Sequence, residues 1–194
     1  MLSERKKEER NIRKTRILEG ALRVFNEVGI DKTTMDEIAI ESGFGKATLY
    51  YYFSSKDEVF VEIMGSGWKQ LWEGIESLIV EEVSPRKKFI GIIKEMGRIV
   101  TKDKILYGFL FKAPEFMKDI QNQPWKTYQE RLYAILQSII EEGIKKKDFV
   151  DLNPGLLMKA IGGLFHQLLM SDSDSLNDKD FEVMLKTFLK PKNN

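Results

Sequence analysis

Apolar residues recur along almost the whole chain at positions i, i+3, i+4 and i+7, the spacing of one helical face. No stretch alternates apolar and polar residues as a half-buried strand would. The pattern predicts an all-α protein of about nine helices, separated by glycine, proline or serine punctuation. We expect them over residues 12–28, 35–42, 46–53, 56–80, 85 to about 100, 104–113, 124–146, 154–170 and 178–189.

The punctuation is densest between residues 33 and 60. Thr34 and Glu37 have the spacing of a capping box, so a helix should begin at Met35. Gly43 should end it in a left-handed conformation, which glycine adopts freely. Gly45 can then cap a second short helix, and Ser55 with Glu58 repeats the capping-box spacing for a third. Two short helices joined at a glycine turn indicate a helix-turn-helix.

This stretch resembles the DNA-binding domain of TetR-type transcriptional repressors, without a gap in spacing. The matching positions are Thr34, Ile38, Ala39, Gly43, Lys46, Thr48, Leu49, Tyr50, Phe53, Lys56 and Phe60. Two positions depart from the family pattern. Phe44 replaces a smaller aliphatic residue, and Gly45 replaces a serine, which weakens the cap of the second helix by a few tenths of a kcal/mol.

The resemblance implies which side chains contact a DNA operator. Base edges or the groove floor are expected to face Lys46, Ala47, Thr48 and Tyr51, and phosphates are expected to be held by Thr34, Tyr50, Tyr52 and Lys56. Helical spacing supports an exposed face, because Leu49 and Phe53 fall on the opposite side. The helix over residues 12–28 should cover Ile38, Ala39, Leu49 and Phe53, giving a three-helix domain.

The same resemblance implies two domains, 1–55 for DNA binding and 56–194 for ligand binding and dimerisation. A small-molecule effector of unknown identity is expected against the larger side chains of the second domain. The candidates are Met64, Trp68, Trp72, Phe89, Met96, Tyr107, Phe111, Trp125, Tyr128, Phe165 and His166. The two last helices should form a homodimer interface through Leu157, Ile161, Leu164, Leu168, Phe181, Met184, Leu185 and Phe188.

Charge is unevenly distributed. Residues 1–16 hold seven basic and three acidic side chains, whereas the whole chain carries only +1. The positive end therefore adjoins the proposed DNA-reading unit, either as a phosphate-contacting arm or as a solvated terminus. With no cysteine, one histidine and no apolar run of membrane-spanning length, the chain is expected to be cytoplasmic, without a metal site, cofactor or membrane partner.

Three other interpretations compete. The acidic stretch 172–180 has part of an EF-hand spacing but lacks its glycine and final glutamate, so a solvated loop is favoured. No nucleophile or phosphate-loop motif is present, and we expect no enzymatic activity. The main hypothesis is a ligand-responsive repressor. The alternatives are a constitutive DNA-binding protein whose second domain only dimerises, and a small-molecule binder or enzyme with a vestigial DNA domain.

Overall fold

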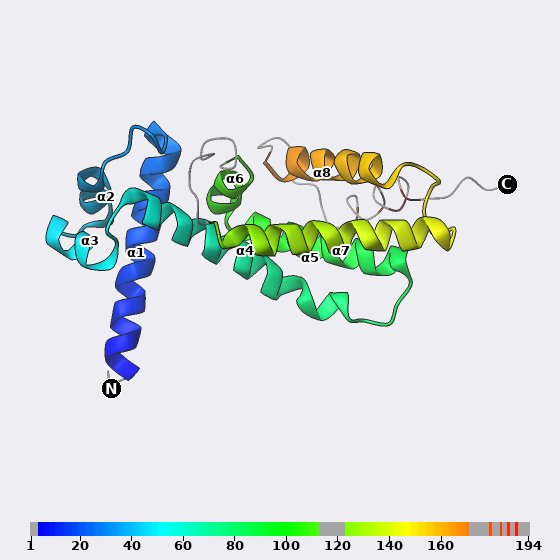
Figure 1. Cartoon of the computed structure of the whole chain (residues 1–194), viewed down its shortest axis with the longest axis horizontal. Helices are drawn as coiled ribbons and strands as arrows, with labels where there is room; N and C mark the ends of the chain where they lie inside the picture. Colours follow the sequence, from blue (N-terminus) through cyan, green and yellow to red (C-terminus); the bar gives the residue numbers. More distant parts are fainter. Residues whose placement is uncertain are drawn as a thin grey trace. The chain divides into compact units, whose positions relative to one another are not determined.

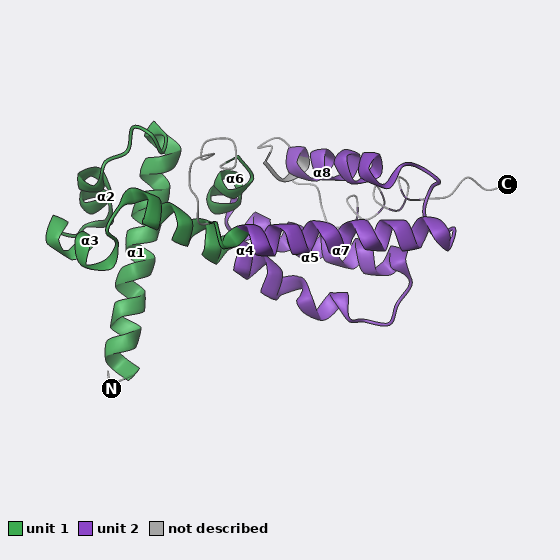
Figure 2. Ribbon diagram, viewed as in Figure 1, with its two compact units in different colours: residues 1–67, 105–125 green, residues 68–104, 126–194 purple. Residues whose placement is uncertain are grey.

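The computed structural model describes residues 4–112 and 123–170, together with the single residues 179, 183, 186 and 189; side chains are described as far as residue 167 of the second range. All regular structure in these residues is helical (Figure 1). The chain forms two compact units, one of Met1–Gly67 and Ile105–Trp125, the other of Trp68–Lys104 and Lys126–Asn194 (Figure 2). The predicted all-α class is confirmed.

The first unit begins with α1 (Glu4–Val28), α2 (Met35–Ser42) and α3 (Lys46–Tyr52). The predicted punctuation is confirmed here: Gly29 and Gly43 have φ of 85° and 72°, the region in which side-chain-bearing residues are strained. The apolar stripe of α1 is buried, and so are the inner sides of the two short helices. These buried residues are Ile17, Ala21, Leu22, Phe25, Ile38, Ala39, Leu49 and Phe53.

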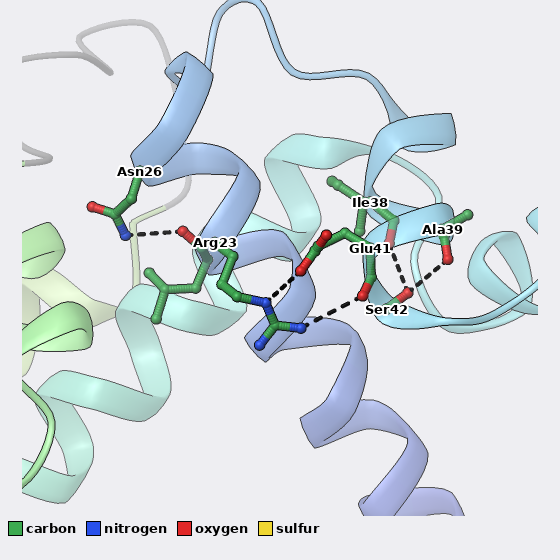
Figure 3. A network of polar contacts seen from close by, with 7 residues as sticks. Arg23, Asn26, Ile38, Ala39, Glu41 and Ser42 are labelled. Atoms are coloured by element: carbon green, nitrogen blue, oxygen red, sulfur yellow. Dashed lines mark hydrogen bonds and ion pairs between the residues drawn. The ribbon is translucent and has the colours of Figure 1, made fainter.

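A close approach fixes α2 on α1. A Cβ atom on Gly20 would lie 2.8 Å from the backbone nitrogen of Ser42, so only glycine allows this spacing. At the same place the Arg23 guanidinium donates to the Glu41 carboxylate at 2.5 Å, while the buried Ser42 hydroxyl donates to the Ile38 carbonyl at 2.7 Å (Figure 3). The contact therefore holds α2 in one position on α1.

Helix α4 (Lys56–Ile79) begins in the first unit and continues into the second. Its first half is packed by α6 (Lys104–Lys112), which returns to the first unit from later in the chain. Phe109 of α6 stacks on Phe25 of α1 at 5.8 Å and meets Phe60 of α4 edge-on at 5.9 Å. Three helices from distant parts of the sequence are thus joined by two aromatic contacts of one residue, Phe109.

The second unit contains the rest of α4 with α5 (Pro85–Lys102), α7 (Trp125–Lys145) from its second residue on, and α8 (Pro154–Met170). Side chains cap the starts of α5 and α8: the Ser84 hydroxyl accepts from the Lys87 amide at 3.4 Å, and the Asn153 side chain accepts from the Leu156 amide at 3.0 Å. Phe89 of α5 meets Phe149, after α7, edge-on at 5.9 Å. Helix α8 packs on α5.

Two predictions about organisation stay open. The ninth helix, expected over residues 178–189, falls almost wholly outside the described residues, as does the acidic stretch 172–180 except for Lys179. The functional division between residues 55 and 56 also stays a prediction, whereas the compact units divide inside α4, between Gly67 and Trp68. In the described part of the chain, no helix is both long enough and apolar enough to cross a membrane.

Candidate nucleic-acid interface

Helix α3 presents the face that the sequence predicts. Lys46, Ala47, Tyr50 and Tyr51 are exposed, and Tyr51, the base-reading candidate, keeps 72% of its surface accessible. Thr48 and Tyr52 are half-buried, and the Tyr51 and Tyr52 rings meet edge-on at 5.2 Å. Leu49 is fully buried beneath them. An exposed row of aromatic and hydroxyl groups on a rigidly packed helix suits a surface that contacts DNA, where such groups bind phosphates and base edges.

Lys46 does not stand alone on this face. Its ammonium lies 2.8 Å from one carboxylate oxygen of Asp36 and donates to the other at 3.0 Å. Asp36 lies in the first turn of α2, so the ion pair joins α2 to α3. The hydrogen bond and the charge of Asp36 raise the pKa of Lys46 above its ordinary value. Lys46 is therefore fully charged at neutral pH, and the negative charge beside it belongs to the same face.

The predicted capping box at Thr34 is confirmed. The Thr34 hydroxyl accepts from the Glu37 amide at 3.3 Å and donates to the Glu37 carboxylate at 2.8 Å, and the Thr34 amide donates to the same carboxylate at 2.8 Å. The backbone and then the side-chain hydrogen bond from Thr34 lower the pKa of Glu37. A threonine hydroxyl has one hydrogen to give, and this one is given to Glu37.

Lys56 is also engaged within the protein. Its ammonium donates to the carbonyl oxygens of Ile30, Asp31 and Thr33 at 2.9, 2.9 and 3.1 Å. An ammonium has three hydrogens, so these bonds account for all of its donors. Lys56 thus anchors the segment between α1 and α2 to the start of α4, a role that the sequence did not suggest. A phosphate contact by Lys56 would require one of these bonds to open.

The second capping box is only half as predicted. The Ser55 hydroxyl accepts from the Glu58 amide at 3.2 Å, but the Glu58 carboxylate accepts from the amide and hydroxyl of Ser54, at 2.7 and 2.8 Å. The carboxylate therefore reaches one residue further back than in a capping box. Its pKa is lowered by these bonds, that from the backbone first.

Sequence reasoning missed two charged groups beside α3. Asp36 is one. The sequence feature that could have indicated it is an acidic residue in the first turn of α2 together with a lysine at the first position of α3. Arg16 of α1 is the other: its guanidinium lies over the Phe44 ring, 5.4 Å from the centroid, at the turn before α3. Phe44 departs from the family pattern, and this contact shows what its ring does in the fold.

The candidate ligand contacts are mostly packed side chains. Eight of them are buried: Met64, Trp68, Trp72, Phe89, Met96, Tyr107, Trp125 and Phe165; Phe111, Tyr128 and His166 are half-buried. Trp72 lies under the Arg131 guanidinium at 4.2 Å and donates to Glu76 at 3.2 Å. Met64, Tyr107, Phe111 and Trp125 belong to the first unit and the others to the second. A shared effector site stays a prediction, and the described residues contain no cluster of three metal-ligating side chains.

The predicted dimer face of α8 stays a prediction. Leu157 and Ile161 keep only 3% and 4% of their surface exposed, because this side of the helix lies inside the chain's own fold. The exposed side of α8 carries Leu156, Ala160 and Gly163 instead. Leu164 is half-buried, and the side chains of Leu168, Phe181, Met184, Leu185 and Phe188 lie outside the described residues.

Comparison with known proteins identifies the domain that this geometry suggests. Residues 17–63 match the family described as bacterial regulatory proteins, tetR family. The chain is 28% identical to the uncharacterised HTH-type transcriptional regulator YfiR of Bacillus subtilis, over 80% of this chain and 83% of the relative. It is 27% identical to IcaR of Staphylococcus aureus, the negative transcriptional regulator of the biofilm operon icaADBC, over 91% and 80%.

Solved structures show the same fold. The crystal structure of AibR in complex with isovaleryl coenzyme A and operator DNA superposes with a TM-score of 0.79 at 17% identity, over 92% of this chain and 99% of that one. The resemblance found in the sequence is thereby confirmed, since the family model, the curated relatives and the fold agree. The relatives are transcriptional regulators.

Proposed function

We propose that this chain, which carries a DNA-binding domain of the tetR family at residues 17–63, is a ligand-responsive transcriptional repressor that binds a palindromic operator as a homodimer. The observation that carries the proposal is the face of α3: Lys46, Tyr50 and Tyr51 are exposed on a short helix that packs on α2 and whose opposite side chain, Leu49, is fully buried. A recognition helix held in this way can enter the major groove as one body.

Within this interface the side chains divide by role. Lys46, Ala47, Thr48 and Tyr51 face the bases, while Tyr50 and Tyr52 offer hydroxyl donors to phosphates. Thr34 and Lys56 position the interface, because their donors are used on Glu37 and on the segment between α1 and α2. Phosphate contacts fix the register of the helix on the duplex, and base contacts select the sequence.

Dimerisation doubles the number of base pairs that the protein can read. One recognition helix covers too few base pairs for useful selection, whereas a two-fold dimer reads two half-sites about 34–36 Å apart. The exposed side of α8 supports such a dimer, since Leu156 keeps 57% of its surface accessible and Gly163 would let another backbone approach closely. Leu164 and the predicted residues beyond α8 complete the proposed interface.

We propose that a small hydrophobic or amphipathic ligand releases the protein from its operator by moving helix α4. It carries the anchor Lys56 at one end and the buried Trp68 and Trp72 further along, so a ligand that displaces Trp68 would move α4 as a lever. The ligand must bind the DNA-free form better, typically by about 1–3 kcal/mol of coupling. The crystal structure of AibR with isovaleryl coenzyme A and operator DNA is a precedent for a ligand in this fold.

The test is selection of duplexes from a random pool by the purified protein. We expect enrichment of a two-fold symmetric site, lost in Tyr51→Ala and kept in Ile105→Ala, which trims an exposed side chain outside α3. Repeating the selection with hydrophobic ligands should reduce recovery of the site. Enrichment that no ligand alters would favour the constitutive DNA-binding alternative, and no enrichment at all would contradict the proposal.

A further inference from the structure

The Asp36–Lys46 ion pair places a carboxylate on the surface that is proposed to meet a polyanion. Both oxygens of Asp36 lie within 3.0 Å of the Lys46 ammonium, and the side chains remain 58% and 62% exposed. The two residues come from different helices, Asp36 from the first turn of α2 and Lys46 from the first residue of α3. The pair therefore determines the direction of the Lys46 side chain relative to both helices.

Stability does not account for this pair. Exposed ion pairs contribute little to folding, because water and salt screen them and two long side chains must be ordered. Helix α2 is already held on α1 by the close approach at Gly20 and by the Arg23–Glu41 contact. What the pair does fix is the position of a flexible lysine, and holding a side chain in advance lowers the ordering cost of binding.

The pair also leaves Lys46 able to bind. An ammonium has three hydrogens, and the two observed contacts with the oxygens of Asp36 use at most two of them. At least one hydrogen stays available to an acceptor such as O6 or N7 of guanine in the major groove. Without Asp36, the same ammonium could instead turn toward the nearest phosphate, which carries no sequence information.

We propose that Asp36 is a specificity-determining residue, which holds the Lys46 ammonium toward base acceptors and away from the phosphate backbone. This inference rests on the proposed function, because it requires that α3 reads DNA. Asp36 acts through Lys46 and is a positioning residue. Its removal should therefore change which sequences are bound, and should not simply weaken binding.

The experiment compares four proteins with the wild type: Asp36→Asn, Lys46→Met, the double variant, and the control Asp57→Asn. The control removes one exposed carboxylate from the first turn of α4, and so repeats the change of charge. Each protein is bound to a library in which every position of the selected site is varied, at several salt concentrations. The readouts are base preference at each position and the slope of log affinity against log salt.

We expect Asp36→Asn to reduce preference at the position read by Lys46 by roughly fivefold or more, the lower end of what one specific base contact gives. Binding to unrelated DNA should rise, and the salt slope should steepen by up to ~0.9 if the ammonium takes one phosphate. In the Lys46→Met background, Asp36→Asn should leave base preference unchanged. Asp57→Asn should shift all sequences equally.

Three results would overturn the inference. Asp36→Asn could change the affinity for every DNA sequence by the same factor, as is expected of Asp57→Asn. Asp36 would then act only through its charge. Asp36→Asn could change base preference as much in the Lys46→Met background as in the wild type. Alternatively, Lys46→Met could leave the base preference at every position unaltered. In these cases the wild type still selects a site and the proposed function stands. If the wild type selects no site, the proposed function itself has failed.

Discussion

At the scale of single residues, the lysine at the start of α4 has a structural role, because its ammonium is hydrogen-bonded within the protein. Lys56 donates to three carbonyl oxygens between α1 and α2. We predict that Lys56→Met destabilises the protein by about 1–3 kcal/mol, because two part-buried carbonyl acceptors, those of Ile30 and Thr33, lose a charged donor. Denaturant unfolding measures this, with Lys32→Met, an exposed lysine of the same segment, as the control. Equal stability of both variants would show that the three bonds contribute nothing.

The capping carboxylate of α2 gives a pH dependence with a definite sign. The Thr34 amide and hydroxyl lower the pKa of Glu37 from its ordinary 4.5. The stabilising contribution is therefore complete above 4.5 and is lost as pH falls through the lowered pKa of the folded state. We predict that wild type and Glu37→Gln differ in unfolding free energy at neutral pH and converge in acid. A difference that widens on acidification would contradict this assignment.

Sequence patterns predicted the residues whose role is local, and missed those whose role is tertiary. The Thr34 capping box and the left-handed Gly43 follow from spacing within one turn, and both are confirmed. The bonds of Lys56 span 23 to 26 residues and end on backbone carbonyls, which no side-chain pattern encodes. Asp36 was missed for a similar reason, since its partner is ten residues away on another helix.

At the scale of elements, two glycines of α4, Gly65 and Gly67, differ in how closely other helices pack against them. A Cβ on Gly67 would lie 2.6 Å from the nearest methyl carbon of Leu110 in α6, whereas nothing lies within 4 Å of a Cβ on Gly65. We predict that Gly67→Ala destabilises the protein by about 1–3 kcal/mol through overpacking. Gly65→Ala should stabilise it by up to about 1 kcal/mol through helix propensity.

Thermal or denaturant unfolding of this pair of variants provides the measurement. Both substitutions add the same methyl group to the same helix, so helix propensity cancels in the comparison. Two variants of equal stability would mean that Leu110 moves aside freely and that Gly67 has no packing role.

Most helix bounds were predicted well, except that α1 begins at Glu4 and not near residue 12, whereas packing partners were not predicted. The expected long helix over residues 56–80 is observed as Lys56–Ile79, because proline, serine and glycine mark helix ends locally. Helical periodicity does not specify which later helix returns to the first unit, so the Phe109 contact with Phe25 and Phe60 was not foreseen. On α8 two of the predicted interface residues, Leu157 and Ile161, are buried within the single chain, since the pattern of an almost wholly apolar helix does not distinguish core from interface.

At the scale of the whole molecule, the proposed dimer rests on the exposed side of α8. We predict that Leu156→Glu gives monomers in sedimentation velocity, because two introduced carboxylates would face each other across a two-fold axis. Val80→Glu, which alters a side chain 79% exposed after α4, is the control and should remain dimeric. A Leu156→Glu protein that stays dimeric would place the interface elsewhere.

The central claim is that α3 reads DNA sequence. Its most direct test is the affinity of the wild-type protein for the selected duplex and for a scrambled duplex of the same length and composition, by fluorescence anisotropy at physiological salt. We predict that the selected duplex binds at least about 10³-fold tighter, the lower end for specific regulators. Equal affinities would mean that the chain binds DNA only through charge, and would contradict the account.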